Sequence, residues 1–132
     1  MFALQRAFFF TLLLIVVILG STRLIHHFQM SQMATATRFR SVEFEVFGNV
    51  QGVFFRKHTE KKANQLKLVG WVKNTPHNTV VGVIQGPHDS IETMRIWLST
   101  KGSPKSRITK CEFKNNLSIA SREFQSFTII RK

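Results

Sequence analysis

Apolar and polar residues alternate in the stretch that begins at Ser41. Val42, Phe44 and Val46 are apolar, and the two residues between them are glutamates. A period of two turns successive side chains to opposite faces of the backbone, which is typical of a half-buried β-strand. The sequence therefore predicts a first strand that begins at Ser41.

Two later segments have apolar residues at helical spacing. The first runs from Phe54 to Leu66, where apolar residues recur on one face among lysines and glutamate. The second follows Asp89-Ser90-Ile91-Glu92, which has the acceptor-x-x-Glu form of a capping box. Gly102 and Pro104 are expected to end this second helix.

Four further segments have the composition of strands, and turn residues separate them. They are residues 68–74, 79–85, 107–114 and 124–131. The order is strand, helix, strand, strand, helix, strand, with one extra strand at the end. This order predicts a ferredoxin-like α+β fold, an α/β sandwich in which two helices cover one face of an antiparallel sheet. The predicted domain extends from residue 41 to 132.

The first forty residues follow neither pattern. Sixteen uncharged, mostly apolar residues lie between Arg6 and Arg23 without an amphipathic period. Such a run has no polar face for water, so residues 1–40 are predicted to be a hydrophobic anchor or targeting segment with a basic linker. A spanning helix normally has ~20 apolar residues, so length alone leaves a cleaved secretory signal peptide open. An acid-free, Arg-containing start also leaves a mitochondrial transit peptide open.

An uncleaved anchor is favoured among these alternatives, because no Ala-x-Ala pattern precedes Gly20. We therefore expect membrane association through residues 7–22. Arg6 lies on one side of the run and three arginines on the other, so the positive-inside rule predicts a domain that faces the cytosol. The sequon Asn116-Leu117-Ser118 would be used only in a luminal domain.

The chain is strongly basic, with 19 Lys and Arg, 7 Asp and Glu, and a net charge of +12. This charge favours anionic partners such as phosphates, nucleic acids or acidic lipids. Cys111 is the only cysteine, so no intrachain disulfide can form. It alternates with charged residues, which predicts a thiol on the buried face of a strand and not a nucleophile.

The predicted topology brings three anion-binding features to one edge of the sheet. Asn74 ends the second strand beside the turn 48–53 and the helix start that carries Arg56. A glycine-bracketed turn and a helix N-terminus both present backbone N–H groups to an anion. Arg56 supplies a planar cationic fork, and Asn74 can orient a water without titrating. Each feature also has an ordinary explanation, as a simple turn, a solvated arginine and a hairpin residue.

Two motifs resemble the signatures of the acylphosphatase family. Gly48-Asn49-Val50-Gln51-Gly52-Val53-Phe54-Phe55-Arg56 resembles the first signature. Gly70-Trp71-Val72-Lys73-Asn74, continuing to Val80 and Gly86, resembles the second, and the similarity covers residues 41–132. The resemblance implies a hydrolase that cleaves the carboxyl-phosphate bond of acyl phosphates to a carboxylate and inorganic phosphate.

The resemblance also assigns site residues. Arg56 matches the family's phosphate-binding arginine and Asn74 its water-orienting asparagine, so these two are the predicted catalytic residues. The predicted substrate-binding residues are Gly48, Val50, Gln51, Gly52, Val53, Phe54 and Thr75. Asn78 stands where the second signature has glycine. Because Asn accepts positive φ more readily than other non-glycine residues, we expect the turn to form and activity to persist.

The remaining predictions concern cofactors and partners. A carboxylate is a good leaving group, and the five histidines have no metal-ligand spacing, so we predict no metal and no cofactor. The predicted partners are small acyl phosphates or aspartyl-phosphate proteins, and the catalytic domain is predicted to be monomeric. One alternative is a ferredoxin-like nucleic-acid-binding module, but the third strand lacks the aromatic motif of RNA-recognition domains. The other is a non-catalytic anion-binding module.

Overall fold

The computed structural model describes residues 2–36 and 39–132, with side chains described for residues 11–30 of the first range. The chain divides into two compact units, Met1–Thr35 and Ala36–Lys132. The first unit is one helix, α1, Phe2–Ala36. Its segment Thr11–Met30 is long and apolar enough to cross a membrane, and none of it is buried. By length and composition, α1 is a candidate spanning helix.

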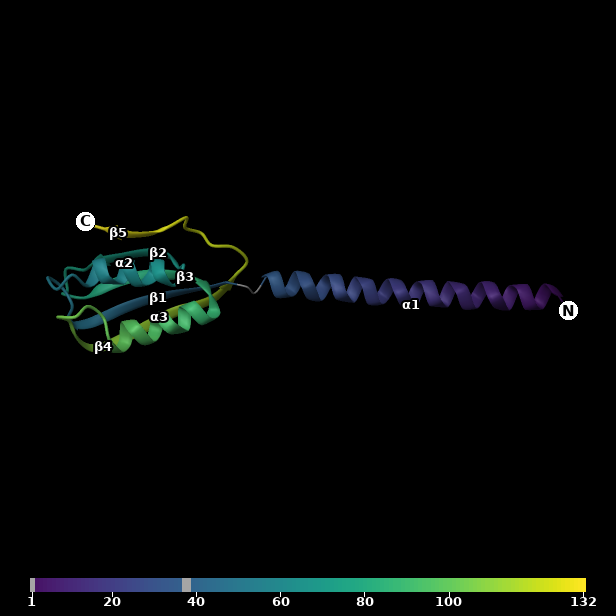
Figure 1. Cartoon of the computed structure of the whole chain (residues 1–132), viewed down its shortest axis with the longest axis horizontal. Coiled ribbons are helices and arrows are strands. Elements are labelled where there is room, and N and C mark those ends of the chain that lie inside the picture. Colours follow the sequence, from purple (N-terminus) through teal and green to yellow (C-terminus); the bar gives the residue numbers. More distant parts are fainter. Residues whose placement is uncertain (1, 37–38) are drawn as a thin grey trace. The chain divides into compact units, whose positions relative to one another are not determined.

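The second unit is a five-stranded sheet with two helices (Figure 1). Its strands are β1 (Phe39–Asn49), β2 (Val69–Asn74), β3 (Val80–Pro87), β4 (Arg107–Ile119) and β5 (Phe127–Ile130). The spatial order is β4-β1-β3-β2-β5. β1 is antiparallel to β3 and β4, and β2 is antiparallel to β3, whereas β2 and β5 are parallel.

The ferredoxin-like fold class is confirmed, with one correction to the sheet. We predicted an antiparallel sheet, but the extra strand β5 runs parallel to β2, with Gly70 opposite Phe127 and Lys73 opposite Ile130. A parallel neighbour needs a long crossover, and the chain between β2 and β5 provides one through β3, α3 and β4. The sheet is therefore mixed.

The helices are α2 (Phe55–Gln65) and α3 (His88–Thr100). The predicted capping box is wrong, because α3 begins at His88 with Pro87 as its N-cap and has no side-chain cap. Asp89 lies inside the first turn, where a carboxylate stabilises the helix dipole instead. α3 ends as predicted, with Gly102 at φ 59° just after it.

The core lies between the sheet and the two helices. Val42, Phe44 and Val46 of β1 are buried, as their alternation predicted. Phe55 of α2 packs on Trp97 of α3, with ring centroids 5.9 Å apart. Apolar burial of this kind is the main stabilising term of a domain without disulfides.

Cys111 is half-buried on β4 and packs against this core, so its predicted place is confirmed. Burial raises the pKa of the Cys111 thiol to about 12, although a hydrogen bond with Ser99 and the charge of Arg95 act in the opposite direction. A thiol with this pKa is protonated at neutral pH and is a poor nucleophile.

Candidate active site

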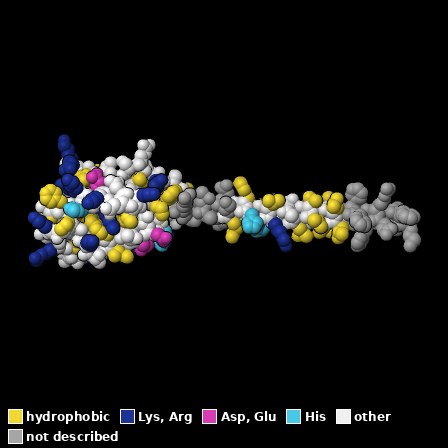
Figure 2. All heavy atoms as spheres, viewed as in Figure 1, with side chains coloured by type: hydrophobic (Ala, Val, Ile, Leu, Met, Phe, Trp, Pro, Cys, Tyr) yellow, Lys and Arg dark blue, Asp and Glu magenta, His cyan; other side chains and the backbone are white. Residues whose placement is uncertain are grey.

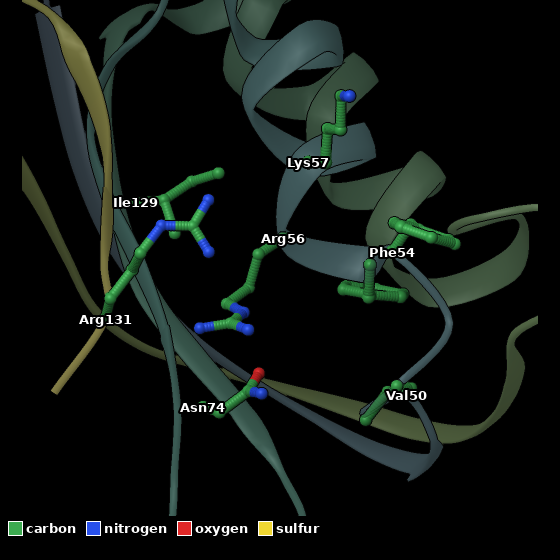
Figure 3. Close-up of a pocket in the computed structure, with 9 residues that line it drawn as sticks. Val50, Phe54, Arg56, Lys57, Asn74, Ile129 and Arg131 are labelled. Carbon is green, nitrogen blue, oxygen red and sulfur yellow. The ribbon is translucent and has the colours of Figure 1, made fainter.

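A cavity of about 380 Å³ opens where β1 is followed by α2, beside the ends of β2 and β5. Residues from four parts of the chain line it: Val50, Gly52, Phe54, Phe55, Arg56, Lys57, Asn74, Ile129 and Arg131. Figure 3 shows the Arg56 guanidinium directed toward the Asn74 amide, with Arg131 on the far side of Arg56. The cavity therefore brings a cation and a neutral amide together from separate elements.

Arg56 is held by the start of α2. Phe54, the N-cap residue, has φ 58° and ψ 25°, and Gly52 before it has φ 73°. These two left-handed residues turn the chain sharply into the helix, so that Arg56 falls in its first turn. The first turn contains no acidic residue, and no side chain caps it. Its free N–H groups and the positive end of the helix dipole attract an anion in the cavity.

Asn74 lies at the end of β2, opposite Val80 of β3. Its Oδ1 atom is buried and has no hydrogen-bond partner within the described protein. A buried acceptor without a partner costs ~1–3 kcal/mol, so structures keep one mainly where function uses it. The amide is aimed at Arg56 (Figure 3). Asn74 thus offers an acceptor to a molecule inside the cavity.

Gln51 fixes the loop after β1 to the turn that follows Asn74. Its Nε2 atom donates hydrogen bonds of 2.9 Å to the carbonyl oxygens of both Thr75 and Thr79. The Thr75 and Thr79 hydroxyls are 2.6 Å apart, and the Thr79 hydroxyl also donates to Glu45 on β1 at 2.8 Å. These bonds hold the loop that leads to Arg56 and the strand end that carries Asn74 at a fixed separation.

The cavity contains five of the nine predicted site residues, which are Val50, Gly52, Phe54, Arg56 and Asn74. The other four lie around it. Gln51 and Thr75 belong to the hydrogen-bonded support just described, and Val53 packs against the core. Gly48 has φ 129°, and a Cβ atom there would lie 2.0 Å from the Arg107 carbonyl oxygen. Gly48 therefore allows β4 to approach β1.

Sequence reasoning missed four cavity residues, namely Phe55, Lys57, Ile129 and Arg131. Phe55 and Lys57 flank Arg56 in the sequence, so their position next to a predicted catalytic residue could have identified them. Ile129 and Arg131 come from the last strand and the residue after it, and only the parallel pairing of β5 with β2 places them here. The sequence showed this strand but not the edge of the sheet that it joins.

The turn between β2 and β3 has the predicted conformation. Asn78 has φ 64°, the left-handed region that glycine favours. The Thr75 N–H donates to the Thr79 carbonyl at 2.9 Å and closes the turn. Asn78 therefore replaces glycine without disrupting the turn beside Asn74.

Fold and cavity together define a ferredoxin-like α+β domain with a cationic pocket at a helix start. The family model for acylphosphatase matches residues 42–129. Acylphosphatase-1 of Xenopus tropicalis is 55% identical over 91 residues, which cover 69% of this chain and 93% of that protein. Human acylphosphatase-2 is 50% identical over 97 residues, which cover 74% and 98%. The chain belongs to the acylphosphatase family, and it is an enzyme that hydrolyses acyl phosphates.

Solved structures agree with this assignment. An acylphosphatase from Coxiella burnetii superposes with a TM-score of 0.64 at 33% identity, covering 70% of this chain and 94% of that one. The Bacillus subtilis acylphosphatase gives a TM-score of 0.64 at 30% identity, covering 69% and 98%. These relatives consist almost entirely of the matched domain. A domain of this extent therefore folds without the segment that contains α1.

Proposed function

We propose that Arg56 and the loop from Gly48 to Arg56 bind the phosphate of an acyl phosphate, and that Asn74 orients the attacking water. The convergence of Arg56 and the partnerless Asn74 Oδ1 atom in one cavity carries this proposal. The guanidinium offers paired donors that match two phosphate oxygens. The uncapped start of α2 adds backbone donors on the same side.

The reaction is an in-line displacement at phosphorus. The water donates a hydrogen bond to Asn74 Oδ1, which leaves an oxygen lone pair free for the phosphorus. A bond forms between the water oxygen and phosphorus while the bond from phosphorus to the acyl oxygen breaks. That electron pair leaves with the carboxylate, and a phosphate oxygen takes the water's proton. Arg56 stabilises the negative charge on the phosphoryl oxygens in the transition state.

This route uses no general acid, because a carboxylate leaves as a weak base. Within the described residues, no group of three or more His, Cys, Asp or Glu is arranged to hold a metal ion. The chemistry therefore depends on positioning and charge. We expect turnover to continue in the presence of EDTA.

The direct test is hydrolysis of benzoyl phosphate by residues 36–132 and by two variants. Arg56→Gln should lower kcat/KM by about a hundredfold or more, and Asn74→Ala should lower kcat to a similar degree. Arg95→Gln is the matched control, because Arg95 pairs with Glu92 on α3 and is not a cavity residue. A loss of tenfold or less in a folded Arg56→Gln variant would contradict its proposed role.

We extend the substrates to aspartyl phosphates on proteins, because the mouth of the cavity is open. Phe54 is 71% exposed and Arg131 is also exposed, and the two line the cavity on opposite sides of Arg56 (Figure 3). Exposed side chains on both sides of Arg56 leave the cavity accessible to a phosphorylated side chain on a protein surface. The lifetime of the aspartyl-phosphate form of a membrane ion pump should shorten when the domain is added. An unchanged lifetime beside rapid benzoyl phosphate hydrolysis would limit the substrates to small molecules.

We also propose that residues 1–40 tether a monomeric catalytic domain, residues 41–132, to a membrane on its cytosolic side. The candidate span Thr11–Met30 supports the tether. Alkaline carbonate should fail to extract the full chain from membranes.

Asn116 of the sequon accepts a hydrogen bond from Arg40 Nε and is exposed, so it would be open to glycosylation in a lumen. Glycosylation of Asn116 would contradict the cytosolic orientation.

A further inference from the structure

The helix layer carries a groove between α2 and the end of α3 that the catalytic proposal does not use. The groove has a volume of about 200 Å³, and its lining includes Lys61, Lys62, Lys101 and His58. No acidic residue lines it. Lysine ammonium groups that share a groove without carboxylates repel one another, so a bound anion relieves this repulsion. The groove is therefore suited to a negatively charged partner.

These lysines form no ion pair with another described residue. The ion pairs among the described residues are Arg95–Glu92 and Lys110–Glu112, and neither involves the groove. Lys61 and Lys101 are exposed, and Lys62 is half-buried. Three cations are thus available to an external surface.

The groove differs in charge from the hollow on the opposite, helix-free face. That hollow is lined by Glu43, Glu45 and Glu112 together with Lys114. In the view of Figure 2, Lys and Arg side chains spread over the domain and few acidic ones interrupt them. A domain that presents a groove lined by lysines adopts a preferred orientation at an anionic surface.

The basic residues continue along α2 toward the catalytic cavity. Lys57 lines both the catalytic cavity and the shallow hollow that it shares with His58, Glu60 and Lys61. Residues 54, 57, 58 and 61 have the spacing i, i+3, i+4 and i+7, so they form one stripe along the start of α2. At its end stands Phe54, an aromatic side chain that is 71% exposed. Basic residues with an exposed aromatic are typical of segments that lie on membranes.

We propose that the groove lysines Lys61, Lys62 and Lys101 dock the catalytic domain on an anionic lipid surface. The choice of a membrane over other polyanions rests on the proposed tether. The candidate span ends at Met30 and β1 begins at Phe39. The eight residues between them reach at most about 30 Å, so a tethered domain meets headgroups at high effective concentration. Docking through this face places the mouth of the catalytic cavity close to the membrane.

The test uses residues 36–132, which lack the span, so the docking is measured without the tether. Flotation with vesicles of phosphatidylcholine and phosphatidylserine should recover the domain at 0.1 M salt, and vesicles of phosphatidylcholine alone should not. Replacing the three groove lysines with Gln should weaken the binding on the order of a hundredfold. The matched control replaces Lys73, Lys110 and Lys114 with Gln. Lys73 lies over the ring of Trp71 and Lys110 over the ring of Phe47. Lys114 lines the hollow on the helix-free face.

The control triple variant removes the same net charge from the other face and should weaken binding less than threefold. Hydrolysis of benzoyl phosphate without vesicles should be unchanged in the groove variant, which verifies its fold. Equal losses in both variants would show a diffuse charge effect and overturn the proposal. Failure of the parent domain to float would overturn it too, as would binding to single-stranded RNA without binding to the vesicles. Carbonate extraction of the full chain tests the tether separately. A failure of the tether and a failure of the docking surface therefore give different experimental results.

Discussion

Gln51 provides a sharp test of how the site is held together, because it lies outside the cavity. Its side chain makes two hydrogen bonds of 2.9 Å to the carbonyl oxygens of Thr75 and Thr79. A neutral hydrogen bond contributes ~0.5–1.5 kcal/mol, so Gln51→Ala should lower the free energy of unfolding by about 2 kcal/mol. For a domain of this size, Tm should fall by about 8 to 16 °C.

The same change should slow the reaction. Without the bridge from Gln51, the strand end that carries Asn74 is no longer fixed against the loop that leads to Arg56. A misplacement of about 1 Å can cost up to a hundredfold in rate, so we expect kcat for benzoyl phosphate to fall about tenfold. The substrate phosphate still meets Arg56, so KM should change less.

Gln85 is the matched control for this prediction. Its side chain is buried and bridges Ser41 and Glu123 with three hydrogen bonds, at a place that contributes nothing to the cavity. Gln85→Ala should lower Tm at least as much as Gln51→Ala and leave kcat unchanged at a temperature where both variants are folded. If the two variants had the same kcat as the parent, the positioning role of Gln51 would be refuted.

Three further predictions concern single residues. Because the pKa of Cys111 is raised to about 12 from 9.0, the folded state holds this proton more tightly than the unfolded state. Its contribution to stability is therefore complete below pH 9 and is lost as the pH rises toward 12, a loss that chemical denaturation should reveal in the parent and not in Cys111→Ala. Asn78→Gly should raise the free energy of unfolding by less than about 1 kcal/mol in urea, and a decrease would contradict strain at φ 64°. Arg131→Gln should raise KM for benzoyl phosphate up to about fivefold with kcat nearly unchanged, because Arg131 is an exposed cation of the cavity lining. An unchanged KM would exclude a substrate contact.

Local patterns predicted the elements of this fold well. The alternation around Val42, Phe44 and Val46 predicted β1, because a strand in a sheet that is covered on one face buries every second side chain. Element ends were less predictable. β4 continues to Ile119, beyond the predicted Lys114, because its later residues pair with the start of β1. Such a pairing is a property of the partner strand and leaves no signal in the segment itself.

The residues of the site also differ in how far the sequence could predict their positions. Arg56 and Asn74 could be predicted to meet, because the strand order of the fold brings their segments to one edge. Arg131 could not, because its position depends on a parallel pairing across the whole domain. The capping-box error at Asp89 has a local cause, since an acidic residue is equally suited to an N-cap and to the first turn.

The most direct test of the mechanism follows the oxygen of the attacking water. Benzoyl phosphate should be hydrolysed by residues 36–132 in water enriched in ¹⁸O, with EDTA present, and both products analysed by mass spectrometry. Attack on phosphorus by a water that Asn74 orients predicts one labelled oxygen in inorganic phosphate and none in benzoate. Label in benzoate would place the attack on the carbonyl carbon and contradict the proposed roles of Arg56 and Asn74.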